Sequence, residues 1–335
     1  MELWQDLVEQ YRSFAQHARD ESPCFHDWAS AVADDQEVLT WIRQLPRIKQ
    51  QPNLVFAAAR WHGVAAPGPY DGLRRALLQD RGAIRETILA RATQTNEPGR
   101  LATLAPVFAA LAAGAGRPLA LLEVGASAGL CLYPDRYAYR FRATDGDLTW
   151  DPAPSARGAR PELAARMAGG FTAPTGGVPV GWRGGLDLHP VDLADRDQVA
   201  WLETLVWPEQ DDRRARLAQG VRIARHDPPV VVRGDLRSDL PALLDRASRH
   251  GAVIVFHTAV LAYLEAPERE AFQDRMTELV AAGACHWVSN EGLQVLPRVT
   301  ASAPGSPGPG LDFVLGVDGE AVAWTHGHGI AATWF

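Results

Sequence analysis

Residues 119–130 join an apolar run to a loop of very small side chains, a pattern that can bring a nucleotide or cofactor against the protein main chain. The run ends in Glu123 and Val124, and the loop after it contains, in order, Gly125, Ala126, Ser127, Ala128 and Gly129. The two glycines can adopt backbone angles closed to other residues, and the small side chains between them leave room for a ligand. The sequence therefore predicts a ligand-binding turn after a buried strand. The alternative is a plain tight connection between a strand and a helix.

Two aspartates are expected near the same turn. Asp187 closes a short predicted strand at residues 185–188, and Asp235 follows the apolar run at residues 230–232. Because ligands collect at the carboxyl ends of parallel strands, we expect Glu123, Asp187 and Asp235 to line one site for an adenosine-type ligand. Asp187 would accept hydrogen bonds from ribose hydroxyls, and Asp235 would lie near the adenine amino group. Either aspartate can alternatively cap a helix or form a turn.

His257 and Glu291 are the candidates for a proton acceptor in this site. His257 follows the apolar run at residues 253–256, and Glu291 follows Asn290 after the predicted strand at residues 286–288. Imidazole titrates near neutral pH, so His257 can act as a general base, and Glu291 can take the same part. The alternative for either is a polar residue whose hydrogen bonds are simply satisfied at a strand end.

A dense polar stretch, Gln-Thr-Asn-Glu-Pro-Gly-Arg, occupies residues 94–100 between two predicted helices. We expect Gln94, Asn96 and Arg100 to bind substrate, because Arg100 can hold a carboxylate through two parallel hydrogen bonds. Glu97 is a further catalytic candidate. The alternative is that Thr95 or Asn96 caps the helix that follows.

His326 and His328 flank a single glycine in a segment that we expect to form the last strand. Side chains alternate along a strand, so both imidazoles would lie on the same face and could bind substrate. With His257 or Glu291 they could also chelate a metal ion. No zincin-type helix motif accompanies the pair, so a metal cofactor is not favoured.

Composition limits the classes of function. The chain has 335 residues, is 47% hydrophobic and carries a net charge of -7. Its basic residues are scattered among acids, which argues against a nucleic-acid partner. Lys49 is its only lysine, which excludes a phosphate-binding loop lysine and a pyridoxal Schiff base elsewhere. The three cysteines show no paired spacing, and no signal peptide or membrane span is evident, so we expect a cytoplasmic protein without a membrane partner.

Hydrophobic periodicity predicts two regions. Residues 1–115 read as a helical cap, and residues 116–335 as an α/β domain with an insertion of short strands and loops at about 135–182. Residues 197–224 read as one long amphipathic helix. Apolar strands alternate with helices and end in an antiparallel pair around Asp318-Gly319, which is the order of a doubly wound, mostly parallel sheet.

The turn at residues 125–129, preceded by Glu123, resembles the first motif of class I methyltransferases, which surrounds the methionyl and ribose groups of S-adenosylmethionine. This resemblance implies a Rossmann-like core. Two features depart from it. Asp187 lies much farther from the turn than the usual ~20 residues, which requires a large insertion. Phe256-His257-Thr258 stands where an Asp-Pro-Pro-Tyr or Asn-Pro-Pro-Tyr sequence would follow the fourth strand.

The chain as a whole resembles the uncharacterised family called domain of unknown function 2332. The matching blocks are residues 94–97 with 99–100, 123–130, 135–137, 185–187 with 190–192, 201–202 with 207–209, 233–235, and 286–288 with 291–292. The resemblance implies a methyltransferase-like core and marks these blocks as working residues, but it implies no particular reaction.

These observations lead us to expect an S-adenosylmethionine-dependent methyltransferase that acts on a small molecule. One alternative is a metal-dependent hydrolase that uses His257, His326, His328 and Glu291. A second is a nucleotide-binding module without catalysis. The methyl acceptor and the oligomeric state do not follow from the sequence.

Overall fold

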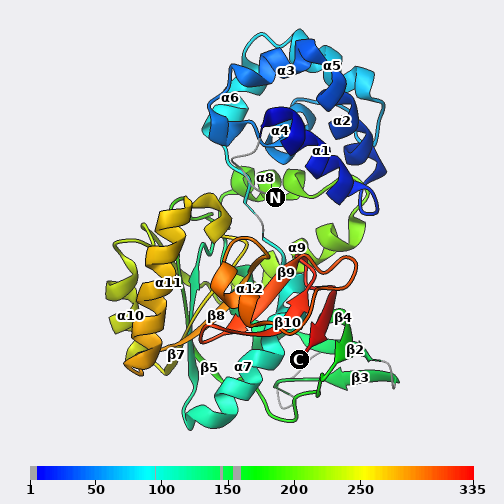
Figure 1. The fold of residues 1–335 in the computed structure, drawn as a ribbon. Helices are drawn as coiled ribbons and strands as arrows, with labels where there is room; N and C mark the ends of the chain where they lie inside the picture. Colours follow the sequence, from blue (N-terminus) through cyan, green and yellow to red (C-terminus); the bar gives the residue numbers. More distant parts are fainter. Residues whose placement is uncertain (1–5, 95, 144–145, 154–159) are drawn as a thin grey trace. The chain divides into compact units, whose positions relative to one another are not determined.

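The computed structural model describes residues 6–94, 96–143, 146–153 and 160–335. The chain divides into two compact units (Figure 1). The first contains Met1–Thr95 and Asp195–Ala215, and the second contains Asn96–Ala194 and Arg216–Phe335. Residues 96–115, grouped with the helical region in the sequence, thus belong to the same unit as the sheet.

The first unit is helical. Its helices are α1 (Leu7–Ala18), α2 (Pro23–Asp34), α3 (Gln36–Arg43), the short η1 (Arg47–Lys49), α4 (Pro52–Trp61), α5 (Tyr70–Leu78), α6 (Ala83–Ala90) and α8 (Arg196–Leu205). Four of them begin at side-chain caps, because Asp6, Ser22, Asp35 and Asp195 each accept a hydrogen bond from a free main-chain N–H of the first turn. Packed aromatic rings of Phe14, Phe25 and Phe56 fill the interior.

The long helix expected at residues 197–224 is wrong, because the structure has two helices there. The first, α8, ends at Leu205, and α9 covers Asp211–His226. Pro208 lies in the break, where its ring and missing N–H disfavour a continuous helix. Trp201 and Trp207 are buried, as expected for core residues.

The second unit contains one sheet of eleven strands in the order β3-β2-β4-β11-β10-β9-β8-β7-β1-β5-β6. The strands that position the candidate site are β1 (Leu119–Val124), β5 (Val180–Asp187), β6 (Val230–Arg233), β7 (Ala252–Thr258) and β8 (His286–Gly292). These five strands pair in parallel with one another. Numbered by their sequence among themselves, they lie in the doubly wound order 3-2-1-4-5. The order reverses between β1 and β7, so the topological switch point lies between them.

The sheet continues beyond β8 through antiparallel strands, as the C-terminal pattern predicts. β9 (Phe313–Val317) and β10 (Glu320–Thr325) form a hairpin closed by Asp318, which has a positive φ of 52°. The sequence did not indicate β11 (Ala331–Trp334), a strand of only four residues.

The insertion extends this same sheet. Its strands are β2 (Ala138–Ala143), β3 (Gly146–Trp150) and β4 (Glu162–Gly169). β4 pairs in parallel with β11, so this pair joins the strands of the insertion to the rest of the sheet. The short 3-10 turns η3 (Leu130–Leu132) and η4 (Pro134–Arg136) lead from the glycine-rich loop to β2. No long helix therefore follows that loop directly.

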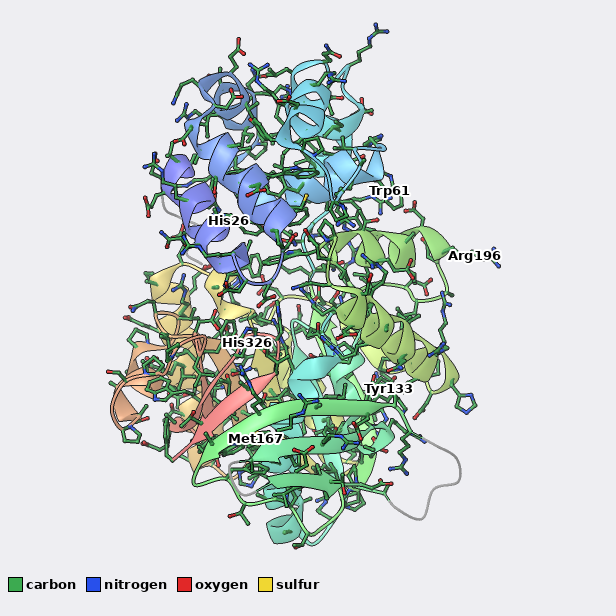
Figure 2. The ribbon with its side chains drawn as sticks, turned by 90° about the vertical axis from the view of Figure 1, so that its right-hand side faces the viewer. His26, Trp61, Tyr133, Met167, Arg196 and His326 are labelled. Carbon is green, nitrogen blue, oxygen red and sulfur yellow. The ribbon has the colours of Figure 1, made fainter. Side chains whose placement is uncertain are left out.

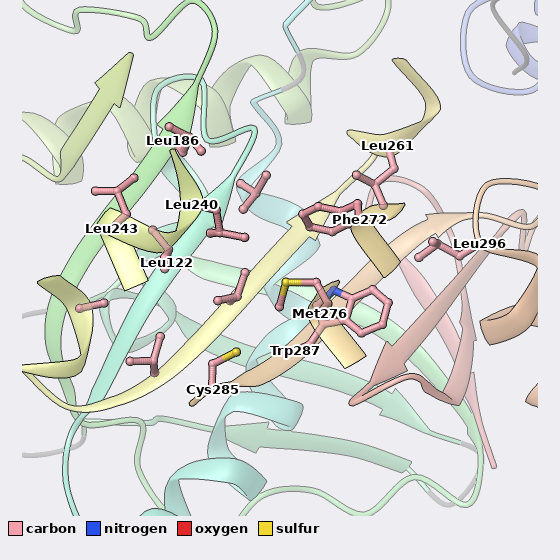
Figure 3. Packing of buried hydrophobic residues seen from close by; sticks show 14 of the residues in the cluster. Leu122, Leu186, Leu240, Leu243, Leu261, Phe272, Met276, Cys285, Trp287 and Leu296 are labelled. Carbon is pink, nitrogen blue, oxygen red and sulfur yellow. The ribbon is translucent and has the colours of Figure 1, made fainter. Parts of the chain in front are cut away.

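Helices cover both faces of the parallel strands (Figure 1). On one face, α10 (Leu240–Ser248) and α11 (Ala266–Ala281) enclose a core that includes Leu122, Phe272 and Trp287 (Figure 3). On the other face lies α7 (Leu101–Ala115), whose Phe108 ring contacts Phe256 of β7 at 5.2 Å between centroids.

The segment Pro98–Ala115 is long and apolar enough to cross a membrane by length and composition alone. However, 67% of this window is buried inside the protein. Burial of this extent is expected of a core helix, because neighbouring elements cover most of its sides.

Candidate functional site

The glycine-rich loop after β1 turns back onto β5. Gly125, Ser127 and Gly129 have positive φ angles of 71°, 49° and 68°. The amides of Gly125 and Ala126 both donate to the carbonyl of Leu186, at 2.7 and 3.1 Å. The loop therefore closes against the carboxyl end of β5.

Two polar side chains hold this loop in place. Asp187 accepts hydrogen bonds from the amides of Ser127, at 2.8 Å, and His189, at 2.7 Å. Asn96 accepts from the amide of Ala128 at 3.0 Å and donates to the hydroxyl of Ser127 at 2.8 Å. Asp187 thus meets the loop despite the 60 residues that separate it from Ser127.

Close packing explains why the loop needs glycine. A Cβ atom on Gly125 would overlap the methyl groups of Val260, and one on Gly129 would press against Leu132 and Pro229. Gly125 remains partly exposed. A ligand that reaches Gly125 must therefore lie beside Val260.

Asp235 lies in the loop after β6, and Arg237 binds it. The main-chain amide of Arg237 donates to Asp235 Oδ1 at 2.9 Å, and its guanidinium contacts both carboxylate oxygens. These hydrogen bonds from the Arg237 side chain lower the pKa of Asp235. Asp235 is partly exposed and remains at the carboxyl edge, two residues past β6.

Glu123 lies near the end of β1 and is only 5% exposed. Its Oε2 atom is buried and has no hydrogen-bond partner among the residues that the structure describes. Burial raises the pKa of Glu123 well above its usual value, although the nearby Arg100 charge opposes this shift. Glu123 therefore keeps its proton to a higher pH than an exposed glutamate does.

His257 and Glu291 form a fully buried pair at the ends of β7 and β8. His257 Nδ1 lies 2.7 Å from Glu291 Oε1, and Trp287 Nε1 donates to His257 Nε2 at 2.9 Å. Because Nε2 accepts, the proton is on Nδ1 and is donated to Glu291. Both ring nitrogens are engaged, so neither is offered to a substrate or to a metal ion.

Glu291 also binds main-chain amides of the turn after β7. It accepts from Val260 at 2.9 Å and from Leu261 at 3.1 Å. Ala259, just before them, has a positive φ of 57°. The geometry therefore gives His257 and Glu291 a role in positioning this turn, which touches the glycine-rich loop through Val260.

The polar side chains of residues 96–100 form hydrogen bonds with other residues of the chain. Arg100, 4% exposed, donates from Nε to the carbonyl of Gly327 at 2.8 Å and from Nη1 to the carbonyl of Thr258 at 3.0 Å. Glu97 accepts from the amide of Gly99 at 2.8 Å and from Arg216 Nε at 3.1 Å. Together with Asn96, these side chains connect the glycine-rich loop, the end of β7 and the turn at residues 326–330. Thr95 lies outside the described residues, and Gln94 belongs to the first unit.

His326 and His328 do not lie on a strand, contrary to the sequence prediction. β10 ends at Thr325, and residues 326–330 form the turn that leads to β11 (Figure 2). The amide of His328 donates to His326 Nδ1 at 3.0 Å. Gly327 and Gly329 allow this turn, since a Cβ on Gly329 would overlap the backbone of Gly99 and Arg100.

Val260 and Arg216 of this arrangement were not predicted, because Val260 has no polar group and Arg216 is one of many arginines. Trp287 was marked only as part of the block at residues 286–288, without a role of its own. Only the tertiary structure brings them to His257, Gly125 and Glu97. No sequence signal separates Arg216 from the other arginines of α9.

The fold and site define a protein with a helical unit and an α/β unit, in which polar residues meet at the carboxyl edge of a doubly wound sheet. Residues 8–334 match a family described as an uncharacterised protein conserved in bacteria, domain of unknown function 2332. The chain belongs to this family, as its signature blocks predict. None of the curated proteins and none of the solved structures matches it.

Proposed function

We propose that the α/β unit binds S-adenosylmethionine and that the protein is a methyltransferase acting on a small molecule. The observation that carries this proposal is the placement of Glu123, Asp187 and Asp235 at or just beyond the carboxyl ends of three adjacent parallel strands, β1, β5 and β6. The glycine-rich loop lies at the switch point of the same sheet, where doubly wound proteins bind nucleotides.

The residues around Asp187 suit the nucleoside part of such a ligand. Each carboxylate oxygen of Asp187 accepts one main-chain N–H, and a carboxylate has about four lone-pair sites in all. Capacity for ribose hydroxyls therefore remains. The neighbouring Leu188 is 58% exposed and offers apolar surface to a purine.

Backbone strain supports the same location. Ser127 and Ala259 have positive φ angles, 49° and 57°, although neither is glycine. One follows β1 and the other follows β7, so they flank the switch point. Such conformations cost about 1–3 kcal/mol each and cluster at ligand sites.

The bound cofactor would supply an electrophilic methyl group for in-line displacement. The protein's part is to hold the two reactants in line. In this proposal Asp187 and Asp235 orient the nucleoside, and the His257–Glu291 pair holds the turn containing Val260 beside it. A metal hydrolase built on His257 has no comparable support, because both nitrogens of that imidazole are already hydrogen-bonded.

Thermal denaturation with S-adenosylhomocysteine tests the proposal. Preferential binding to the folded state at 100 times Kd stabilises a protein by about 2.7 kcal/mol and raises the midpoint. Asp187→Asn should reduce this gain, whereas Asp245→Asn, an exposed change on α10, should preserve it. No midpoint shift of the wild-type protein at millimolar ligand would refute the proposal. Binding without methyl transfer to any acceptor would instead favour a non-catalytic nucleotide-binding module.

A further inference from the structure

The helical unit holds a guanidinium group between two tryptophan rings. Trp61 is the last residue of α4, and Trp201 lies on α8. Their rings stand at 75° to each other, with centroids 5.8 Å apart. The guanidinium carbon of Arg91 lies 4.5 Å from the ring centre of Trp61 and 4.9 Å from that of Trp201. Both distances are within the range of about 6 Å over which an aromatic face attracts a cation.

Asp197 completes the surroundings of this cation. Arg91 Nη2 donates a hydrogen bond to Asp197 Oδ2 at 2.7 Å. Aromatic faces and a carboxylate are the groups with which proteins recognise guanidinium and methylated ammonium cations. We call Trp61, Trp201 and Asp197 the cation cage. The side chain of Asp197 is 60% exposed and that of Arg91 is 21% exposed, so solvent reaches the cage.

The aromatic walls of the cage are built on helices other than the one that carries Arg91. α4 and α8 pack against each other and supply the two tryptophans. Arg91 is the C-cap residue of α6. Sites built on helices hold their geometry better than sites on loops. The two rings should therefore keep their places when the guanidinium of Arg91 leaves them.

The main chain beside the cage is held by other contacts. Lys49, the only lysine in the sequence, donates from Nζ to the carbonyl oxygen of Arg91 at 2.6 Å. Trp201 Nε1 donates to the carbonyl oxygen of Ala92 at 2.9 Å. Trp201 thus uses its ring for the cation and its N–H for the backbone. Because these two hydrogen bonds do not involve the guanidinium, the Arg91 side chain can move while its backbone stays in place.

We propose that the cation cage is a binding site for an external guanidinium group, and that Arg91 fills it until such a ligand displaces the Arg91 side chain. The ligand is an arginine side chain of another molecule or a small guanidinium compound. A planar guanidinium can stack on a ring and still direct N–H groups to Asp197, whereas an ammonium group is a compact, strongly hydrated charge. The exchange breaks no covalent bond. The proposal concerns the helical unit and is independent of the proposed function.

Competition with Arg91 determines the expected affinity. A group on a short flexible tether acts at an effective concentration on the order of millimolar. An external guanidinium must overcome this internal competitor, which lowers its apparent affinity for the wild-type protein. Removing the guanidinium in Arg91→Ala should therefore strengthen the binding of an external one at least tenfold.

Titration with methylguanidinium, followed by the indole N–H signals in proton–nitrogen correlation NMR spectra, tests the site. At millimolar concentrations, far below those that unfold proteins, Arg91→Ala should show saturable binding at least tenfold tighter than wild type. Adding Asp197→Asn to Arg91→Ala should weaken this binding at least tenfold. Arg196→Ala removes an exposed arginine (Figure 2) and leaves the cage filled, so it should bind as wild type does. Methylammonium at the same concentration is the control for charge and ionic strength.

Three results would overturn the proposal. They are an absence of saturable binding to Arg91→Ala, equal affinities of Arg91→Ala and wild type, and binding that is unchanged by Asp197→Asn or matched by methylammonium. Should Arg91→Ala fail to fold, the wild-type protein still decides the question. Its indole signals should then shift saturably with methylguanidinium and not with methylammonium, and equal shifts with the two cations would refute the site.

The two sources of ligand are separated by a second titration of Arg91→Ala, with N-acetylarginine amide. Tighter binding of this compound than of methylguanidinium indicates an arginine side chain of another molecule. Equal or weaker binding indicates a small guanidinium compound.

Discussion

His257 donates a hydrogen bond from Nδ1 to Oε1 of Glu291 across 2.7 Å, and both side chains are completely buried. The two residues end neighbouring parallel strands, β7 and β8. Because Glu291 also accepts from the amides of Val260 and Leu261, the pair holds the turn after β7 in place. Polar side chains buried at this depth are normally hydrogen-bonded, as these two are on several sides.

Trp287→Phe tests the hydrogen bond that completes this pair. The change removes the donor to His257 Nε2 and leaves that nitrogen buried without a partner. We expect a loss of about 1–3 kcal/mol in the free energy of unfolding, measured by urea denaturation. Trp182→Phe is the control, because Trp182 is also buried and stacks on His250. Equal losses in the two variants would show that ring size, and not the hydrogen bond, determines the effect.

Glu123→Gln tests the cost of the unsatisfied acid. The pKa of Glu123 is raised in the folded state by burial. Below the unfolded pKa, about 4.3, both states are protonated and the acid carries no ionisation penalty. As pH rises above this value, the unfolded state loses its proton while the folded state keeps it, so the stability of the wild-type protein falls until the raised folded pKa is reached.

The glutamine variant lacks this penalty. Its stability relative to wild type should therefore increase as pH rises from about 4 toward neutrality, in chemical denaturation at a series of pH values. Glu320→Gln, at an exposed position, supplies the reference curve. Parallel stability curves for wild type and Glu123→Gln would contradict the raised pKa.

Gly125→Ala tests the packing of the loop. The new Cβ would overlap Val260, and the residue would have to keep a φ of 71°. Gly283→Ala isolates the conformational part, because Gly283 has a φ of 69° and a Cβ there would meet no atom within 4 Å. The conformational strain alone costs about 1–2 kcal/mol. Gly125→Ala should cost more than this in thermal or chemical unfolding.

Val260→Ala should relieve the additional cost if overlap is its cause. The double variant Gly125→Ala with Val260→Ala should therefore lose less stability than the sum of the two single changes, with a coupling of about 0.5–3 kcal/mol. Strict additivity would show that the two residues do not compete for the same space.

Arg100→Lys tests the buried guanidinium that joins two loops. Lysine cannot reproduce the two directed N–H groups that reach the carbonyls of Gly327 and Thr258. We expect a loss of about 1.5–3 kcal/mol, together with faster amide hydrogen exchange in residues 326–330. Arg117→Lys, which alters an exposed bond to the carbonyl of Ser248, should change neither measurement appreciably. If amide hydrogen exchange in residues 326–330 is unchanged in Arg100→Lys, Arg100 does not stabilise that turn.

Local patterns predicted much of the fold. The continuous apolar runs that became β1 and β7 were recognisable because both faces of a central parallel strand are covered. The run that became β6 forms an edge strand and is only partly buried. Patterns were less informative for β11, which is short, and for the break between α8 and α9, where an amphipathic period continues past Pro208. In the candidate site, the sequence indicated the acids and histidines but not their hydrogen-bond partners.

By itself, the sequence determined the doubly wound α/β class, the glycine-rich turn and the family, because these depend on periodicity, residue size and local order. Only the tertiary structure decided which polar groups are satisfied. His257 is hydrogen-bonded to Glu291 and Trp287, whereas Oε2 of Glu123 has no hydrogen-bond partner among the described residues, because side-chain hydrogen bonding depends on residues that are brought together across the sheet.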